Sequence, residues 1–144
     1  MKNFIPILLI PIFLISCGGT GGFQLTDSEI AIAVQAGTAA AFQFAIKDSV
    51  KRADIAKYVS AVAGVARSAT GKETPDELSQ SLINAIPASI QVELPQIGTL
   101  VVPLVVSIYQ TAKTKYGTDY PKLYSTLNAV ATGLENGVAP YVTK

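Results

Sequence analysis

Cys17 is the only cysteine in a chain of 144 residues, and its neighbours give it a specific setting. An apolar run ends at Leu14 and Ile15, the small residue Ser16 follows, and residues 18–22 after the cysteine read Gly-Gly-Thr-Gly-Gly. A single cysteine forms no disulfide within its own chain and no site with several thiolate ligands. The residues around Cys17 therefore decide how its thiol is interpreted, and an isolated free thiol is one alternative.

Histidine is absent from the sequence, which removes most hydrolytic mechanisms. A Ser-His-Asp or Cys-His unit, a His-Glu-x-x-His zinc site and a neutral-pH imidazole proton shuttle all need that side chain. The Ser-x-x-Lys pairing of some acyl-serine enzymes does not occur in the chain either. We therefore expect no enzymatic activity, no catalytic residue, no bound metal and no cofactor.

Two other residue pairs have spacings that some enzymes use. Tyr109 and Lys113 lie one helical turn apart, as in certain reductases, but no glycine-rich turn between a strand and a helix precedes them to bind a dinucleotide. Gly71 and Lys72 lack the upstream glycine of a phosphate-binding loop. We interpret the first pair as neighbours on a helix edge, and the second as a helix stop followed by a solvated charge.

The segment that precedes Cys17 is typical of a targeting signal. Lys2 supplies a positive start, and residues 4–15 form an uncharged run interrupted by Pro6 and Pro11. A run of about a dozen residues is too short to cross a bilayer core, which needs roughly 20 helical residues. Residues 1–16 are therefore predicted to be a signal peptide.

The four residues from Leu14 to Cys17 resemble the lipobox of bacterial lipoproteins, in which an aliphatic residue, a tolerant position and a small residue precede an invariant cysteine. The resemblance implies that the signal peptidase recognises Leu14 and Ser16, and that Cys17 is lipidated and becomes the first mature residue. Two or three acyl chains anchor a protein durably, whereas one chain binds reversibly. Gly18 replaces the aspartate that retains such proteins at the inner membrane, so a host with two membranes would carry this one on the outer membrane, facing the periplasm.

Removal of residues 1–16 leaves 128 residues, enough for one domain. Lys2 is one of 11 basic residues, so ten basic residues then face ten acidic ones. This balance argues against nucleic-acid binding, which shows as a basic excess. We expect residues 17–25 to hold the lipidated cysteine and a glycine-rich tether, residues 26–137 to form a helical domain, and residues 138–144 to be a tail.

The first two helices are predicted from a cap and from apolar periodicity. Thr26 begins the first helix, where Glu29 completes a capping box, and the uncharged, alanine-rich residues 30–46 continue it. Such a run fits a helix buried in a bundle, which we favour, or a membrane span. The second helix is predicted from about Asp54, after a surface bend at residues 47–54. Arg67 lies in its last turn, and the helix ends before Gly71. Its apolar face comprises Ile55, Tyr58, Val59, Val62, Val65 and Ala66.

The third helix has the clearest start, with Thr74 as its cap and Pro75 at its first position, and Pro87 halts it. Asp76 and Glu77 suit the positive helix end better than acid-base catalysis. Its apolar edge comprises Leu78, Leu82, Ile83 and Ile86. The next residues, 89–93, are ambiguous between a helical turn and an extended connection.

The fourth helix is predicted from Pro95 to Lys115, kinked at Pro103 and closed by Gly117. Residues 94–112 carry no charge and approach spanning length, so membrane insertion stays open beside the favoured buried helix. The fifth helix is predicted from about Asp119 or Pro121 to Asn136, with Gly137 as its stop. Its apolar face comprises Tyr120, Leu123, Tyr124, Leu127, Val130, Ala131 and Leu134.

The predicted fold class is therefore all-α, a compact bundle of about five helices. A shift of 65 residues places Asp54 on Asp119 and Lys57 on Lys122, which suggests an internal repeat of a long uncharged helix followed by an amphipathic one. Under that hypothesis two helical hairpins, first with second and fourth with fifth, are joined by the short third helix. Chance similarity between two amphipathic helices is the alternative.

Two classes of function fit these features. The first is a membrane-anchored, non-enzymatic helical domain that binds a protein partner in the cell envelope. In plan it resembles prophage-encoded surface lipoproteins that block entry by related phages, although no motif carries that likeness. The second is a membrane-active or pore-associated oligomer whose uncharged helices enter lipid. Six tyrosines are candidates for a contact surface, or otherwise for the core: Tyr58, Tyr109, Tyr116, Tyr120, Tyr124 and Tyr141.

Overall fold

The computed structural model describes residues 26–93 and 100–142, and every regular element within these ranges is a helix. The all-α fold predicted from the sequence is confirmed. In chain order the elements are α2 (Asp27–Ala45), α3 (Ser49–Ser68), α4 (Pro75–Asn84), α5 (Ala88–Glu93), α6 (Val102–Tyr116), α7 (Tyr120–Val138) and the 3₁₀ helix η3 (Ala139–Tyr141).

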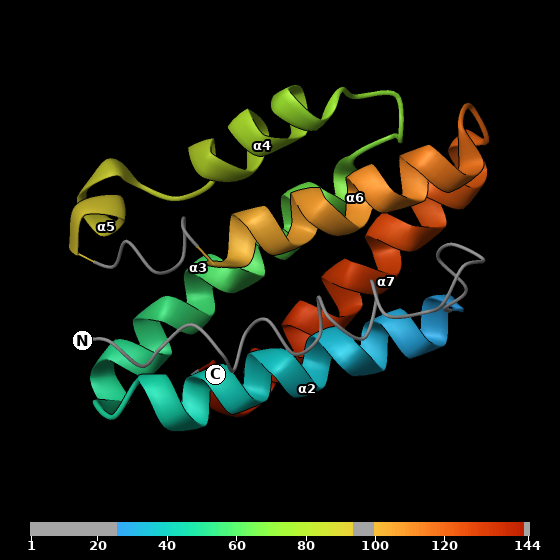
Figure 1. Ribbon diagram of the computed structural model, residues 1–144. Helices are drawn as coiled ribbons and strands as arrows, with labels where there is room; N and C mark the ends of the chain where they lie inside the picture. The colour runs from blue at the N-terminus through green and yellow to red at the C-terminus, as the bar shows by residue number, and fades with distance from the viewer. Residues whose placement is uncertain (1–25, 94–99, 143–144) are drawn as a thin grey trace.

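The last long helix, α7, is the centre of the bundle. It packs against α2, α3 and α6, while α4 packs on α6 and α3. Figure 1 shows α2 along the lower edge of the molecule and α4 along the upper edge, with α7 behind α2. Because three helices share α7, its buried side chains occupy most of its circumference: Leu123, Thr126, Leu127, Ala129, Val130, Ala131, Leu134 and Val138.

Of the two predicted hairpins, only α6 with α7 packs as a pair. Among the helices that the structure describes, α2 and α3 make few contacts with each other, and each instead packs on α7. The proposed repeat also matches positions of different kinds, since Asp119 is the N-cap of α7 whereas Asp54 lies inside α3. The similarity between the two amphipathic segments therefore does not correspond to two similar hairpins.

The predicted caps begin α2 and α4. The backbone N–H of Thr26 donates to Oε2 of Glu29 over 2.7 Å, and the N–H of Glu29 donates to the hydroxyl of Thr26 over 3.3 Å. Thr74 and Glu77 form the same capping box at the start of α4, where Pro75 has no N–H to satisfy. These starts depend on neighbouring residues alone, which is why the sequence predicts them.

The start of α3 lies earlier than predicted. Its N-cap is Asp48, whose Oδ1 accepts the N–H groups of Val50 and Lys51 over 2.9 and 3.2 Å. The charged residues after Asp48 therefore lie in the first turns of a helix, and the predicted start at Asp54 is wrong. Asp48 caps the helix because its carboxylate accepts N–H groups of the first turn, so the charges that follow it do not mark a bend.

The structure bears on two predicted interruptions and one ambiguity. Pro103 lies in the first turn of α6, where its missing N–H breaks no hydrogen bond within that helix. Residues 94–99 lie outside the described residues, so the kink at Pro103 stays a prediction. The predicted stop at Gly137 is wrong, because α7 continues to Val138. The ambiguous residues 89–93 belong to α5, whereas Pro95 lies outside the described residues.

A close approach between α2 and α7 explains why a glycine stands at position 137. A Cβ added to Gly137 would lie 2.6 Å from Cβ of Thr38, and one added to Gly133 would lie 2.5 Å from the carbonyl oxygen of Ala31. Both glycines are helical and buried, so they let the backbones meet. The row of α2 that fills this contact has a spacing of four residues: Ile30, Val34, Thr38 and Phe42.

The expectation that residues 30–46 are buried in the bundle is correct for one side of α2 only. On the other side Ile32 and Phe44 are 62% and 63% exposed. None of the helices described in residues 26–93 and 100–142 combines the length and the apolar character that a membrane span needs.

Candidate functional site

The predicted lipidation residue Cys17 and the recognition residues Leu14 and Ser16 lie outside the described residues, as does the tether up to residue 25. Lipidation therefore stays a prediction. The structure does describe where the tether would join the fold. Thr26 caps α2, and the hydroxyl of Ser125 in α7 donates to Oδ2 of Asp27, so the first turns of α2 and α7 lie together at that end of the molecule.

Tyr109 and Lys113 are neighbours in α6, as interpreted from the sequence, and both form hydrogen bonds with the loop between α3 and α4. The side chain of Tyr109 is fully buried, and its hydroxyl lies 2.8 Å from the carbonyl oxygen of Gly71 and 2.6 Å from that of Glu73. Nζ of Lys113 donates to the same carbonyl of Glu73 over 2.7 Å. Burial, and then the nearby carboxylates of Glu73 and Glu77, raise the pKa of Tyr109, so its hydroxyl keeps its proton and acts as a donor.

The loop that these residues hold connects α3 to α4 and is built around Gly71. This glycine has φ +85°, and a Cβ there would lie 2.9 Å from Cβ of Leu123 in α7, so both conformation and space require glycine. It thus belongs to a loop held against the bundle, three residues past the end of α3. The neighbouring Lys72 has its Nζ 5.8 Å from the ring centre of Tyr120, which is compatible with the predicted solvated charge.

Glu73 closes the same loop with its carboxylate. Oε1 accepts both the N–H and the hydroxyl of Thr70, each over 3.0 Å, and Oε2 accepts the N–H of Gly71 over 2.9 Å. Burial raises the pKa of the Glu73 carboxyl, but these hydrogen bonds outweigh burial and hold the pKa below its ordinary value. The carboxylate therefore satisfies backbone donors of its own loop, which is a structural role.

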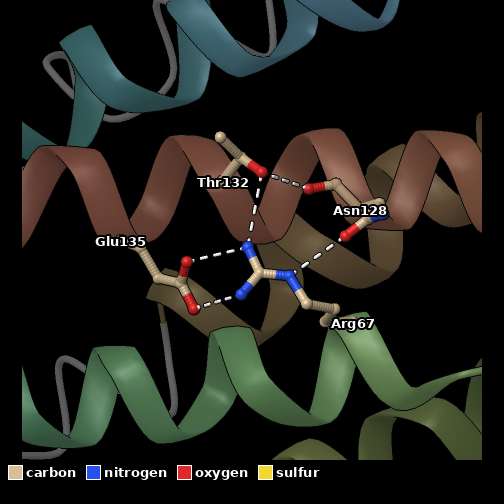
Figure 2. A network of polar contacts seen from close by, with 4 residues as sticks. All are labelled: Arg67, Asn128, Thr132 and Glu135. Carbon is tan, nitrogen blue, oxygen red and sulfur yellow. Dashed lines mark hydrogen bonds and ion pairs between the residues drawn. The ribbon is translucent and has the colours of Figure 1, made fainter.

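Arg67 forms the most extensive polar network between helices that the structure describes (Figure 2). Its guanidinium extends from α3 to α7, where two N–H groups each donate over 2.7 Å to the two carboxylate oxygens of Glu135. Nε donates to Oδ1 of Asn128 over 3.0 Å, and a third contact reaches the hydroxyl of Thr132 at 3.4 Å. The hydrogen bonding to Glu135 raises the pKa of Arg67 above its ordinary value.

This network is the polar feature that sequence reasoning missed. The sequence predicts only that Arg67 lies in the last turn of its own helix, whereas its partners lie 61 to 68 residues further along the chain. The only signal available was the spacing of Asn128, Thr132 and Glu135, which places three polar groups on one side of α7. That spacing alone does not show which helix lies opposite.

The six candidate tyrosines do not form one surface. Tyr109 is buried, whereas Tyr120 and Tyr124 are exposed near the start of α7. Tyr141 of η3 stacks on Phe42 of α2, with ring centres 5.2 Å apart. The remaining two, in α3 and at the end of α6, are half-buried: Tyr58 and Tyr116. The structure thus divides them between core, contacts among elements and surface.

Within the described part of the chain, no cluster of three or more potential metal ligands occurs. No protein-family model, curated protein or solved structure matches this chain. The function is therefore inferred from the residues themselves.

Proposed function

We propose that this protein is a membrane-anchored lipoprotein of the cell envelope whose helical domain binds a protein partner and catalyses no reaction. The observation that carries the proposal is the order of residues around Cys17. A positive start, a short apolar run, Leu14, Ser16 and Cys17 follow one another, and a glycine-rich tether leads from the cysteine to the first cap at Thr26.

The polar side chains that the sequence or the structure singles out in this domain have structural partners. Tyr109 and Lys113 donate to carbonyl oxygens of the loop between α3 and α4. Glu73 accepts N–H groups of that loop, and Arg67 joins α3 to α7. Each of these side chains has partners that account for its presence, so they are better explained as structural than as catalytic groups.

A fatty-acid labelling experiment tests the anchor. The full chain, expressed in bacteria with an alkyne-tagged palmitate, should incorporate the label and lose residues 1–16. A Cys17→Ser variant should do neither, because both acylation and the cleavage that follows it need the thiol. Labelling of the Cys17→Ser variant, or an unlabelled wild-type chain, would overturn the proposal.

Two control variants show whether the setting of the thiol matters. A Ser16→Ala variant keeps a small residue before the cysteine and should be labelled as the wild type is. A double variant, Cys17→Ser with Ser28→Cys, keeps one thiol but places it in the first turn of α2, which is exposed. This double variant should remain unlabelled.

The second candidate is a membrane-active or pore-associated lipoprotein. The exposed Ile32 and Phe44 of α2 are the observation that favours it, since apolar side chains on a tethered helix can enter lipid. Release of a dye trapped in vesicles tests this alternative. Leakage caused by the lipidated chain, and lost in the Cys17→Ser variant, would support membrane activity; intact vesicles that carry the bound protein would reject it.

A further inference from the structure

The side of α2 that points away from α7 is uncharged along most of the helix. Residues 30–46 contain no Asp, Glu, Lys or Arg. Four of them are offset by two positions from the buried row, and two positions correspond to about 200° around a helix of 3.6 residues per turn. They therefore lie on the opposite side from α7, and we name them the outer face of α2: Ile32, Ala36, Ala40 and Phe44.

This outer face lies on the surface of the molecule. Ile32, Ala36 and Phe44 are exposed, and Ala40 is partly so. In Figure 1 the helix forms the lower edge of the molecule, and α7 is the element with which it makes extensive contact. Gln35 and Gln43, the exposed polar residues beside the row, carry no charge.

The small size of the outer face indicates which kind of partner can cover it. It offers two large apolar side chains, Ile32 and Phe44, whereas a stable protein dimer uses about 20–30 residues from each partner. Two side chains are also too few to hold an untethered domain on a membrane. A contact this small becomes effective only where something else keeps its partner close.

The tether provides that proximity. Nine residue steps separate Cys17 from Thr26, and a chain of this length reaches at most about 32 Å, even when fully extended. Thr26 caps α2, so an acyl group on Cys17 keeps the start of this helix near the lipid surface, together with the first turns of α7 that Ser125 joins to it. The bilayer is then the one apolar partner always within reach of the outer face.

We propose that the outer face of α2 rests on the bilayer that holds Cys17, with Ile32 and Phe44 among the lipid headgroups and upper acyl chains. The inference rests on the proposed lipidation. It places α2 along the membrane surface and α4, at the opposite edge of the molecule, towards the solution and a protein partner (Figure 1).

Site-specific fluorescence tests the contact on the full, lipidated chain in vesicles of phosphatidylethanolamine and phosphatidylglycerol. An Ala36→Cys variant carries an environment-sensitive dye on the outer face, and a Gln80→Cys variant carries the same dye on the exposed side of α4. Dye at position 36 should be quenched several-fold more by brominated lipid than dye at position 80. Adding Ile32→Gln and Phe44→Gln to Ala36→Cys should abolish that difference, while circular dichroism reports an unchanged helix content.

The outcomes separate this inference from the proposed lipidation. If the chain floats with the vesicles but both dyes are quenched equally, the anchor holds and the bilayer contact is overturned. If the chain does not float at all and takes up no palmitate, the lipidation itself fails. If the dye at position 36 is shielded from water without quenching by brominated lipid, and position 36 crosslinks between chains, a second copy covers the face and the inference is overturned.

Discussion

Arg67 shows how one side chain can connect helices that are distant in the sequence. Its planar guanidinium matches the two oxygens of Glu135, and such paired, charge-assisted hydrogen bonds are stronger than neutral ones. The two side chains are still 40% and 36% exposed, so water and salt weaken the attraction between their charges. The contribution of the network to stability should therefore be moderate.

Replacing Arg67 by alanine tests that estimate. We expect the Arg67→Ala variant to lose about 1 kcal/mol of unfolding free energy, the upper range for partly exposed pairs, because Asn128 also loses its donor. Urea denaturation followed by circular dichroism measures the loss. Lys57→Ala is the matched control, since it breaks a more exposed pair with Asp54 at 3.5 Å and should change stability little. Equal losses in the two variants would contradict the structural role of Arg67.

Glu73 makes a prediction about pH. Its pKa in the folded protein lies below the ordinary value of 4.5, so the ionised carboxylate stabilises the fold above pH 4.5, and this contribution disappears as the pH falls through the lowered pKa. A Glu73→Gln variant should be about 1 kcal/mol less stable than the wild type at neutral pH, because it loses charge-assisted hydrogen bonds. Denaturation series below pH 4.5 should show the two proteins converging. A constant gap into the acid range would contradict the assignment.

At the scale of elements, the contact of α2 with α7 depends on two missing side chains. Gly133 and Gly137 are one helical turn apart and face the row of α2 that starts at Ile30. The atoms closest to an added Cβ include the backbone oxygens of Ala31 and Gln35, which a rotamer change cannot move away. The two helices would have to separate to accept a larger residue.

Alanine substitutions test this packing. Gly133→Ala and Gly137→Ala should each cost about 1–3 kcal/mol of stability, as overpacking of a core contact does. Gly64→Ala in α3 is the control: nothing lies within 4 Å of a Cβ there, and it should stabilise by about 0.5–1 kcal/mol because alanine favours a helix interior. Thermal unfolding should lower the midpoint for the first two variants and raise it for the third. A gain in stability for Gly133→Ala would show that α2 packs loosely.

The same helices show what the sequence can and cannot predict. The starts of α2 and α4 are predicted correctly because Thr26 with Glu29, and Thr74 with Glu77, interact over three residues. The predicted helix stop at Gly137 is wrong because the sequence does not distinguish a glycine that ends a helix from one that packs closely against a neighbouring helix. The partners of Arg67 and the exposed side of α2 depend in the same way on which helices meet, and that is a property of the whole fold.

At the scale of the molecule, the chain order places the central helix last. α7 contacts α2, α3 and α6, so the earlier helices cannot complete their burial until residues 120–138 are present. α5, by contrast, is a short helix of six residues. Gln91 ties it to the end of α4 by donating from Nε2 to the carbonyl oxygens of Ile83 and Ile86 over 3.1 and 2.7 Å.

This arrangement predicts a gradient of local stability, which amide hydrogen exchange can measure. Exchange in the buried middle of α7, around Leu127 to Leu134, should need global unfolding, because opening that helix removes the packing surface of three others. Exchange in α5 should be faster by orders of magnitude, since it needs only local opening of a short helix. A Gln91→Ala variant should speed exchange in α5 and leave α7 unchanged. Similar protection in α5 and α7 of the wild type would mean that the molecule opens as one unit, and that α7 has no special place in its stability.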